Sequence, residues 1–289
     1  MLDYFSAHPV AFVILAGVLG ALVGSFLNVV IHRLPIMMER EWQAQCEELA
    51  NPETSPRPSE PYNLAVPASS CPGCGHKIRA WENIPLLSYL LLRGKCAGCG
   101  APISFRYPLI EAVTATLSAF VAWHFGFGWE AAAALLLTWA LVPLTVIDID
   151  HQLLPDAITL PFLWIGLGLS LFALFTPPES AILGAIVGYL ALWSVYWGFK
   201  LLTGKEGMGY GDFKLLAMLG AWLGWQVLPV IILLSSLVGA VIGIGMILIL
   251  GRDKSIPIPF GPYLAIAGWI TLIWGQDLTQ AYLHMSGLN

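Results

Sequence analysis

Long apolar runs separated by short polar stretches occupy most of the chain. A helix needs about 20 mainly apolar residues to cross a bilayer. Runs of roughly that length predict helices at the following positions: 10–31, 108–125, 130–149, 156–175, 180–202, 213–224, 226–250 and 259–275. The 213–224 run is short for a span. We therefore predict an all-α polytopic membrane protein with about eight transmembrane helices, or seven if the short run joins its neighbour.

The composition excludes an ordinary soluble protein. Hydrophobic residues make up 57% of the chain and charged residues only 11%, whereas soluble domains carry about 25% charged residues. No basic residues precede the first apolar run, and the run exceeds the 7–15 residues typical of a signal peptide. We therefore expect it to be a transmembrane helix that is not cleaved.

Basic residues set the expected orientation, because Lys and Arg concentrate in cytoplasmic loops. Of the 13 Lys and Arg residues, eight fall between the first two spans: Arg33, Arg40, Arg57, Lys77, Arg79, Arg93, Lys95 and Arg106. With an external N-terminus and eight helices, all 13 lie at or near the cytoplasmic side.

Residues 33–107 form the sizeable polar region of the chain. We therefore divide the protein into a first transmembrane helix (1–32), a cytoplasmic loop with a cysteine module (33–107) and a transmembrane helix bundle (108–289). Within the loop, residues 37–49 have helical composition and predict a helix on the membrane surface. Residues 50–64 are rich in Pro, Ser and Glu, which is typical of a flexible connector.

Four cysteines indicate a metal centre in this loop. Cys71 and Cys74 form one CxxC pair, and Cys96 and Cys99 form a second. Two such turns present four thiolates at the corners of a tetrahedron, as in structural zinc sites. Disulfides are disfavoured in the reducing cytoplasm, and an iron–sulfur or redox role is the remaining alternative. His76 is a spare ligand, and we expect Cys46 to be a free thiol.

Two aspartates stand at the ends of apolar runs. Asp148 ends one run and Asp212 opens another, both on the expected cytoplasmic side. An ionisable residue beside hydrocarbon costs roughly 2.5–3.5 kcal/mol, so its presence suggests a function. Paired aspartates that share a proton can activate water for peptide hydrolysis. Asp150 is expected to be solvated and Asp156 to cap the helix that follows Pro155.

Glycines crowd the approach to Asp212. Gly209 and Gly211 remove side-chain bulk there, so an extended substrate backbone could approach closely. A phosphate-binding loop does not fit, because neither GxGxxG after a strand nor GxxxxGK[ST] is present, and HExxH and GxSxG are also absent. A carboxylate on an ion path remains an alternative for Asp212.

Taken together, these motifs resemble one family. The GxGD sequence at 209–212, IDIDHQLLPD at 147–156, GSFLNVVIHRLP at 24–35 and the two CxxC pairs are similar to the prepilin peptidases of type IV pilus and type II secretion systems. These enzymes belong to the GxGD membrane aspartic proteases, and the resemblance covers nearly the whole chain.

The resemblance implies two activities. The chain would cleave the basic leader of prepilins and pseudopilins at the cytoplasmic face of the bacterial inner membrane. It would then N-methylate the new N-terminus with S-adenosyl-L-methionine. Asp148 and Asp212 match the catalytic pair, the four CxxC cysteines match a zinc site, and Gly94 and Lys95 lie in a stretch linked to methylation. The implied partners are the pilin substrates and the lipid bilayer, with no nucleic acid.

Polar residues of the first helix leave two interpretations open. Asn28 and His32 are one turn apart and share a face, followed by Arg33 at the helix exit, with Ser25 nearby. They either orient substrate or form hydrogen bonds between helices, while Arg33 extends toward the membrane surface.

Two other functional classes compete with the enzyme. A transporter or channel would use the aspartates near the middle of the membrane. A zinc-knuckle scaffold would not need Asp148 or Asp212 at all.

Overall fold

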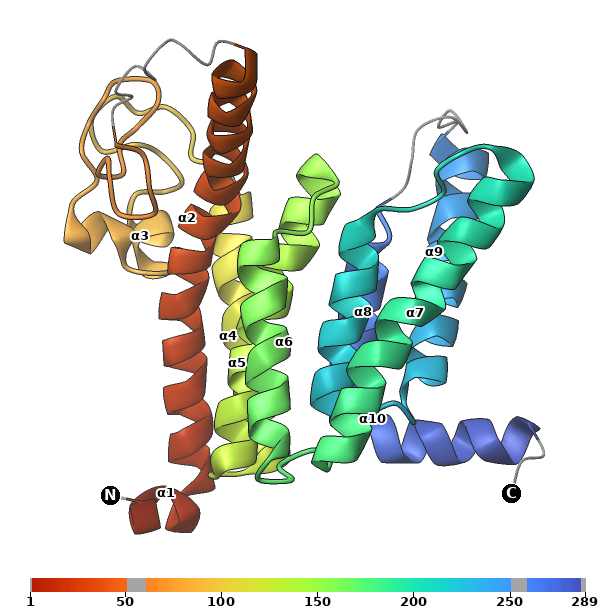
Figure 1. Cartoon of the computed structure of the whole chain (residues 1–289). Helices are drawn as coiled ribbons and strands as arrows, with labels where there is room; N and C mark the ends of the chain where they lie inside the picture. The colour runs from red at the N-terminus through yellow and green to blue at the C-terminus, as the bar shows by residue number, and fades with distance from the viewer. Residues whose placement is uncertain (1, 51–60, 251–258, 287–289) are drawn as a thin grey trace. The chain divides into compact units, whose positions relative to one another are not determined.

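The computed structural model describes residues 2–50, 61–250 and 259–286. Within these ranges the chain is helical, apart from turns and two isolated bridges. Its elements are α1 (Leu2–Ala7), α2 (Pro9–Ala50), the 3-10 helix η1 (Ala80–Asn83), α3 (Leu87–Leu91), α4 (Arg106–Phe125), α5 (Trp129–His151), α6 (Asp156–Ser170), α7 (Pro178–Thr203), α8 (Tyr210–Leu223), α9 (Leu228–Leu250) and α10 (Gly261–Ser286). The all-α prediction is confirmed for the described residues (Figure 1).

The chain forms two compact units, Met1–Phe127 and Gly128–Asn289. The sequence places a boundary before residue 108, whereas the units part about one helix later. The difference arises because α4 packs along α2 and so belongs to the first unit. The three-part topological division into 1–32, 33–107 and 108–289 stays a prediction.

In the first unit, α2 is far longer than one membrane span. It has 42 residues, contains Pro35 and continues through Ala50. The α-helix therefore continues past residue 32, the predicted end of its transmembrane part, and residues 37–49 belong to this helix rather than to a separate one. Helix formers such as Glu, Arg, Gln and Ala follow Pro35 and favour its continuation. Gly20 and Gly24 face α4, where an added Cβ would collide with Ser118 or Glu111.

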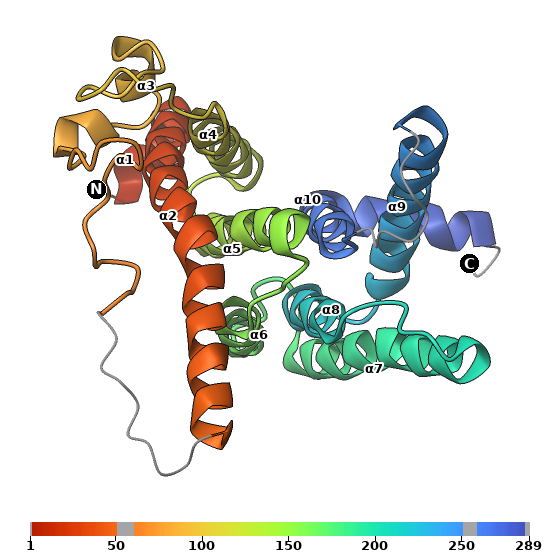
Figure 2. The same cartoon turned by 90° about the horizontal axis from the view of Figure 1, so that it is seen from above.

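In the second unit, α8 lies among α6, α7 and α10 (Figure 2). Its side chains from Phe213 to Trp222 are buried, with Lys214 as the exception. Gly184 of α7 and Gly220 of α8 bring the two backbones into contact. The Trp222 indole N–H donates to the Phe162 carbonyl of α6 over 2.7 Å. These contacts fix α8 as the central element of the unit.

The helices differ in how well they fit a membrane span. Five described helices are long and apolar enough to cross: α2, α4, α5, α7 and α9. α6 and α8, with 15 and 14 residues, are shorter than one span. α6 ends at Ser170 rather than at the expected residue 175. α10 has a non-helical kink at Trp274. Each of the eight apolar segments thus contains a helix in the parts described, while eight crossings remain a prediction.

Candidate active site and metal centre

Asp148 lies near the C-terminal end of α5. Its side chain is buried, with 5% of the residue exposed. The helix ends soon afterwards, because Gln152 adopts a left-handed conformation and its N–H donates to the Asp148 carbonyl. The carboxylate Oδ2 accepts the backbone N–H of Gly261 over 3.0 Å. Gly261 is the first residue of α10, so an unsatisfied N–H at the start of one helix binds a carboxylate of another.

Asp212 occupies the first turn of α8 and is also buried. Its Oδ1 has no hydrogen-bond partner among the described residues. The charges of Asp148 and Asp212 interact, so the structure brings together two aspartates that are 64 positions apart in the sequence. A buried carboxylate oxygen without a partner is costly in an ordinary protein interior. It is suited to bind a water molecule or a substrate.

The α5–α6 connection packs against both aspartate-bearing regions. A Cβ placed on Gly211 would lie 2.7 Å from Leu154 Cβ, and one on Gly261 would lie 3.1 Å from the same side chain and 2.7 Å from Asp148 Oδ2. The missing side chain of Gly211 therefore makes room for Leu154 in this structure. The role of Gly211 in substrate approach stays a prediction. Gly209 immediately precedes α8. A Cβ placed on Gly209 would lie 3.9 Å from Asp212 Oδ2, which is an ordinary van der Waals contact.

An ion pair joins α8 to α6, the helix that follows the Asp148-bearing α5. Lys214 Nζ of α8 lies 2.8 Å from Asp156 Oδ1 and 2.6 Å from Oδ2, at the start of α6. The sequence predicts Asp156 as a helix cap, but its carboxylate instead binds this lysine. Asp150, as expected, is exposed.

Breaking this ion pair should disturb the positions of Asp148 and Asp212 more than it lowers the free energy of unfolding. An exposed ion pair contributes about 0–1 kcal/mol to folding, whereas small displacements of reacting groups can cost about 100-fold in rate. We expect Asp156→Lys and Lys214→Asp each to lower kcat for leader cleavage at least several-fold. The double charge swap should restore much of it. Kinetic assays of the three variants, with intact membrane insertion as the control, test this. Failure of the double variant to recover would show that the side chains act independently.

The four CxxC sulfurs form one cluster in the first unit. All four lie within 4.8 Å of one another. Cys71 Sγ and Cys99 Sγ are 3.9 Å apart, and so are Cys74 Sγ and Cys96 Sγ. A tetrahedron with Zn–S bonds near 2.3 Å has sulfurs about 3.8 Å apart. The donor set therefore fits a single tetrahedral metal ion.

The two CxxC turns have the same backbone geometry. Gly75 and Gly100 have φ of +71° and +73°, values that glycine adopts without strain. Their N–H groups donate to the carbonyls of Cys71 and Cys96, each over 2.9 Å. Backbone N–H groups of Gly73 and Cys74 lower the pKa of Cys71 to about 7. At Cys74 the His76 backbone N–H lowers the pKa, but the Cys99 thiol and other neighbours outweigh it and raise the pKa to about 12. Without a metal, the turn therefore favours the thiolate at Cys71 only. Cys46 lies on α2 and is exposed.

Gly94 lies at a turn between α3 and the second CxxC pair. Its φ is +67°, and an added Cβ would lie 2.9 Å from the Tyr89 hydroxyl oxygen. Its N–H donates to the Tyr89 carbonyl over 2.9 Å. Lys95 beside it is exposed. Glycine is therefore required here both for backbone conformation and for space.

Arg33 attaches the polar loop to α2. Its guanidinium donates to the carbonyls of Asn63 over 2.9 Å and Pro67 over 2.6 Å. The residue is buried, so in this structure it holds the loop rather than extending toward lipid. Asn28 donates to the Tyr107 carbonyl of α4 over 3.1 Å, as expected for a hydrogen bond between helices.

Other residues near these elements have different surroundings. His32 is exposed and Ser25 half-buried. Glu111, a buried residue of α4, was not singled out in the sequence. Its Oε2 accepts the Leu86 N–H over 2.8 Å. A carboxylate six residues into a membrane helix was the signal that could have found it.

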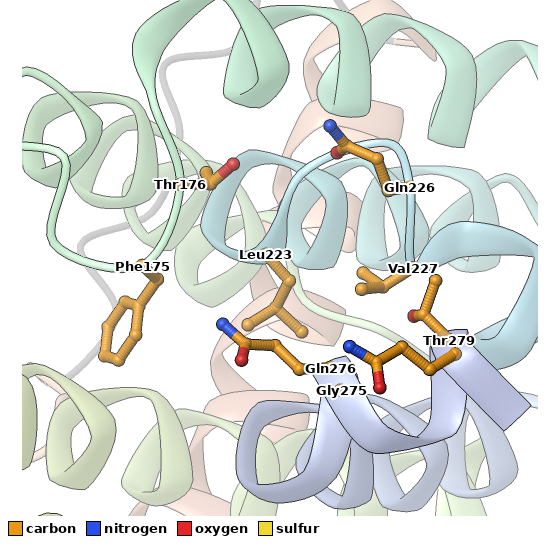
Figure 3. Close-up of a pocket in the computed structure, with 9 residues that line it drawn as sticks. Phe175, Thr176, Leu223, Gln226, Val227, Gly275, Gln276 and Thr279 are labelled. Carbon is orange, nitrogen blue, oxygen red and sulfur yellow. The ribbon is translucent and has the colours of Figure 1, made fainter.

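A pocket of about 320 Å³ lies at the far end of α8 from Asp212. Figure 3 shows Gln226, Gln276 and Thr279 around it, beside the apolar Leu223 and Val227. None of the predicted site residues lines this pocket. It is therefore not part of the aspartate site.

Comparison with known proteins gives the same family over the whole chain. Residues 18–125 match the Bacterial Peptidase A24 N-terminal domain, and residues 135–244 match the Type IV leader peptidase family. Proteins named prepilin leader peptidase/N-methyltransferase are similar throughout. The one from Pseudomonas aeruginosa is 61% identical over 100% of this chain and 99% of its own length. The one from Aeromonas hydrophila is 64% identical over 91% of this chain and 90% of its own. No solved structure matches.

Proposed function

The chain belongs to the type IV leader peptidase family, and we propose that it cleaves the leader of type IV prepilins and type II secretion pseudopilins and N-methylates the new N-terminus. The observation that carries the peptidase activity is the pair of buried aspartates contributed by α5 and α8. An ion path favours carboxylates near mid-membrane. Both aspartates lie within one turn of a helix end, and the Lys and Arg bias predicts that these ends face the cytoplasm rather than mid-membrane.

Asp148 and Asp212 are the proposed catalytic pair. One carboxylate takes a proton from a water molecule while the other, protonated, donates a hydrogen bond to the scissile carbonyl. Water oxygen then bonds to the carbonyl carbon. The C–N bond breaks as the leaving nitrogen receives a proton from the pair. The Gly261 N–H orients Asp148, and the unpartnered Oδ1 of Asp212 is available for water or substrate.

The cysteine cluster is the proposed structural zinc site. Cys71, Cys74, Cys96 and Cys99 would hold Zn²⁺, since their sulfur spacing fits its tetrahedral geometry. Few apolar side chains of the module are buried. The metal would therefore contribute much of the free energy of folding of this part.

For methylation, S-adenosyl-L-methionine would supply the methyl group. The residues proposed to act there are Gly94 and Lys95, on the turn that packs against Tyr89. Their support is the resemblance of this stretch together with its exposure in the polar loop. The target is a neutral amine, because only its lone pair can attack a methyl carbon.

The basic residues support an orientation for both sites. The Lys and Arg bias predicts that residues 33–107 and the helix ends bearing Asp148 and Asp212 face the cytoplasm. The protein would then be a multi-pass protein of the bacterial inner membrane. The leader, by resemblance, is presented on the same side.

A reconstituted reaction tests the function directly. Purified protein is incubated with a prepilin in detergent or vesicles, with and without S-adenosyl-L-methionine. Loss of the leader in both reactions, and gain of one methyl group only with the donor, is the expected result. An intact prepilin in both reactions contradicts the proposal.

The two activities should separate at the Gly94 turn. Gly94→Ala introduces a Cβ against the Tyr89 hydroxyl and disfavours the positive φ. We expect the methylated fraction of mature pilin to fall about 10-fold or more, while cleavage by the dyad of the second unit stays within about two-fold. Mass spectrometry of the product measures both. Gly98→Ala, which places a Cβ 3.0 Å from His76 Cβ in the same module, is the control for a general defect of the module. Proportional loss of both activities in Gly94→Ala would place the methyl-transfer site elsewhere.

A further inference from the structure

A row of exposed apolar side chains runs through the polar loop of the first unit. Its members recur mostly every third residue, through η1 and α3: Ile78, Trp81, Ile84, Leu87, Leu90 and Leu91. We call this set the apolar strip. The three leucines of α3 are 58%, 70% and 75% exposed. Single exposed apolar residues are common on proteins, but six within residues 78–91 indicate a contact surface.

The position of α3 along α4 gives the depth of the strip. The Leu86 N–H, directly before α3, donates to Glu111 of α4. Glu111 is the sixth residue of a 20-residue helix, and such a helix is about 30 Å long, which is the hydrocarbon thickness. Leu86 therefore meets α4 about 8 Å from its first residue along the axis. Figure 1 shows α3 beside the middle of the long helix α2.

A second contact holds α3 at the same level. The rings of Tyr89 in α3 and Phe105, immediately before α4, have centroids 6.3 Å apart. In a bilayer that α4 crosses along its whole length, α3 therefore lies where the acyl chains meet the headgroups. Interfacial helices bury their apolar faces about 5–10 Å deep in that zone.

Charge complementarity identifies the partner surface. Four exposed basic residues flank the strip, namely Lys77, Arg79, Arg93 and Lys95. The one carboxylate between residues 71 and 105 is Glu82, which is withdrawn from the surface and pairs with His76 at 3.0 Å. Each exposed Lys or Arg near an anionic leaflet contributes about 1 kcal/mol of attraction.

We propose that residues 77–95 form an interfacial anchor, in which the apolar strip enters the cytoplasmic leaflet and the flanking basic side chains bind anionic lipid headgroups. This anchor keeps the Gly94 turn at the membrane surface. That last consequence rests on the proposed function. The lipid contact itself does not.

The test measures membrane exposure of a single label. In the full chain with Cys46→Ser, Leu90→Cys is labelled with a nitroxide and reconstituted in vesicles of phosphatidylcholine and phosphatidylglycerol. Leu49→Cys is the matched control, because Leu49 is also an exposed leucine but lies 16 residues beyond Arg33 on α2. Protein with Cys46→Ser alone corrects for label on the metal-site thiols, and its metal content verifies that the module is folded.

We expect the Leu90 label to favour oxygen over a water-soluble nickel reagent several-fold more than the Leu49 label does. The preference should weaken in vesicles of phosphatidylcholine alone. Equal nickel access at both positions overturns the proposal. Protection of Leu90 from both reagents also overturns it, because that would indicate contact with protein.

A functional readout separates the anchor from the proposed activities. Replacing the three α3 leucines with Gln should lower the methylated fraction several-fold and leave leader cleavage intact. Absence of both activities in the unaltered protein would refute the proposed function, while the nitroxide result would still report on the anchor. Normal methylation in the Gln variant, together with a Leu90 label in lipid, would show that the anchor exists but is not needed for methyl transfer.

Discussion

Replacing Asp212 with Asn is expected to abolish leader cleavage while the protein stays folded in the membrane. The amide keeps the size of the side chain but cannot take a proton from water. Loss of one member of a catalytic unit typically lowers kcat by about a thousand-fold or more. The Asp212 Oδ1 has no hydrogen-bond partner among the described residues, so the substitution breaks no observed bond of that oxygen. Cleavage of a purified prepilin, followed by gel mobility and product mass, measures the effect.

Asp148→Asn should have the same effect for the same reason. The Gly261 N–H can still donate to the side-chain amide oxygen of this variant, which preserves the packing of α5 on α10. Asp150→Asn is the matched control, because this carboxylate is exposed only two residues away, and its cleavage rate should change little. Normal cleavage by either variant of the pair would remove that residue from the catalytic pair.

Removing the metal ligands should have the second-largest effect, on folding of the polar module. Structural zinc contributes about 10–16 kcal/mol of apparent binding free energy in small zinc domains. We expect about one equivalent of zinc in the purified protein. The double variant Cys71→Ser/Cys99→Ser should lose it and expose residues 61–105 to protease.

The cysteine outside the cluster provides the control for this experiment. Cys46→Ser should retain the full zinc content, because Cys46 lies on α2 away from the cluster. Elemental analysis of the membrane protein in both variants decides the question. Absence of any metal in the unaltered protein, or full zinc in the double variant, would contradict the assignment.

The helical fold and the pairing of the aspartates could be anticipated from sequence because each follows from a strong local signal. Apolar runs of membrane length predict helices wherever they occur. Asp148 and Asp212 were conspicuous because a carboxylate beside hydrocarbon is costly. The spacing of the paired CxxC motifs predicts a site with four thiolates, and the cluster of four sulfurs agrees with that prediction.

The missed features depend on residues that are distant in the chain. The α2 helix continues past Pro35 because local composition favours it, whereas a hydropathy pattern marks only its membrane part. Lys214 binds Asp156 across two helices, and a pattern that is local to α6 predicts only a cap. Arg33 is buried against carbonyls of a loop about 30 residues away. Such pairings appear only once the packing is known.

The burial of α8 also bears on how members of this family can change over evolution. Apart from Lys214, its residues from Asp212 to Trp222 are enclosed, and Gly220 admits no side chain against Gly184. Mutations along this helix therefore have almost no neutral positions on which to accumulate. New substrate preferences would therefore have to arise on elements other than the helix that carries Asp212.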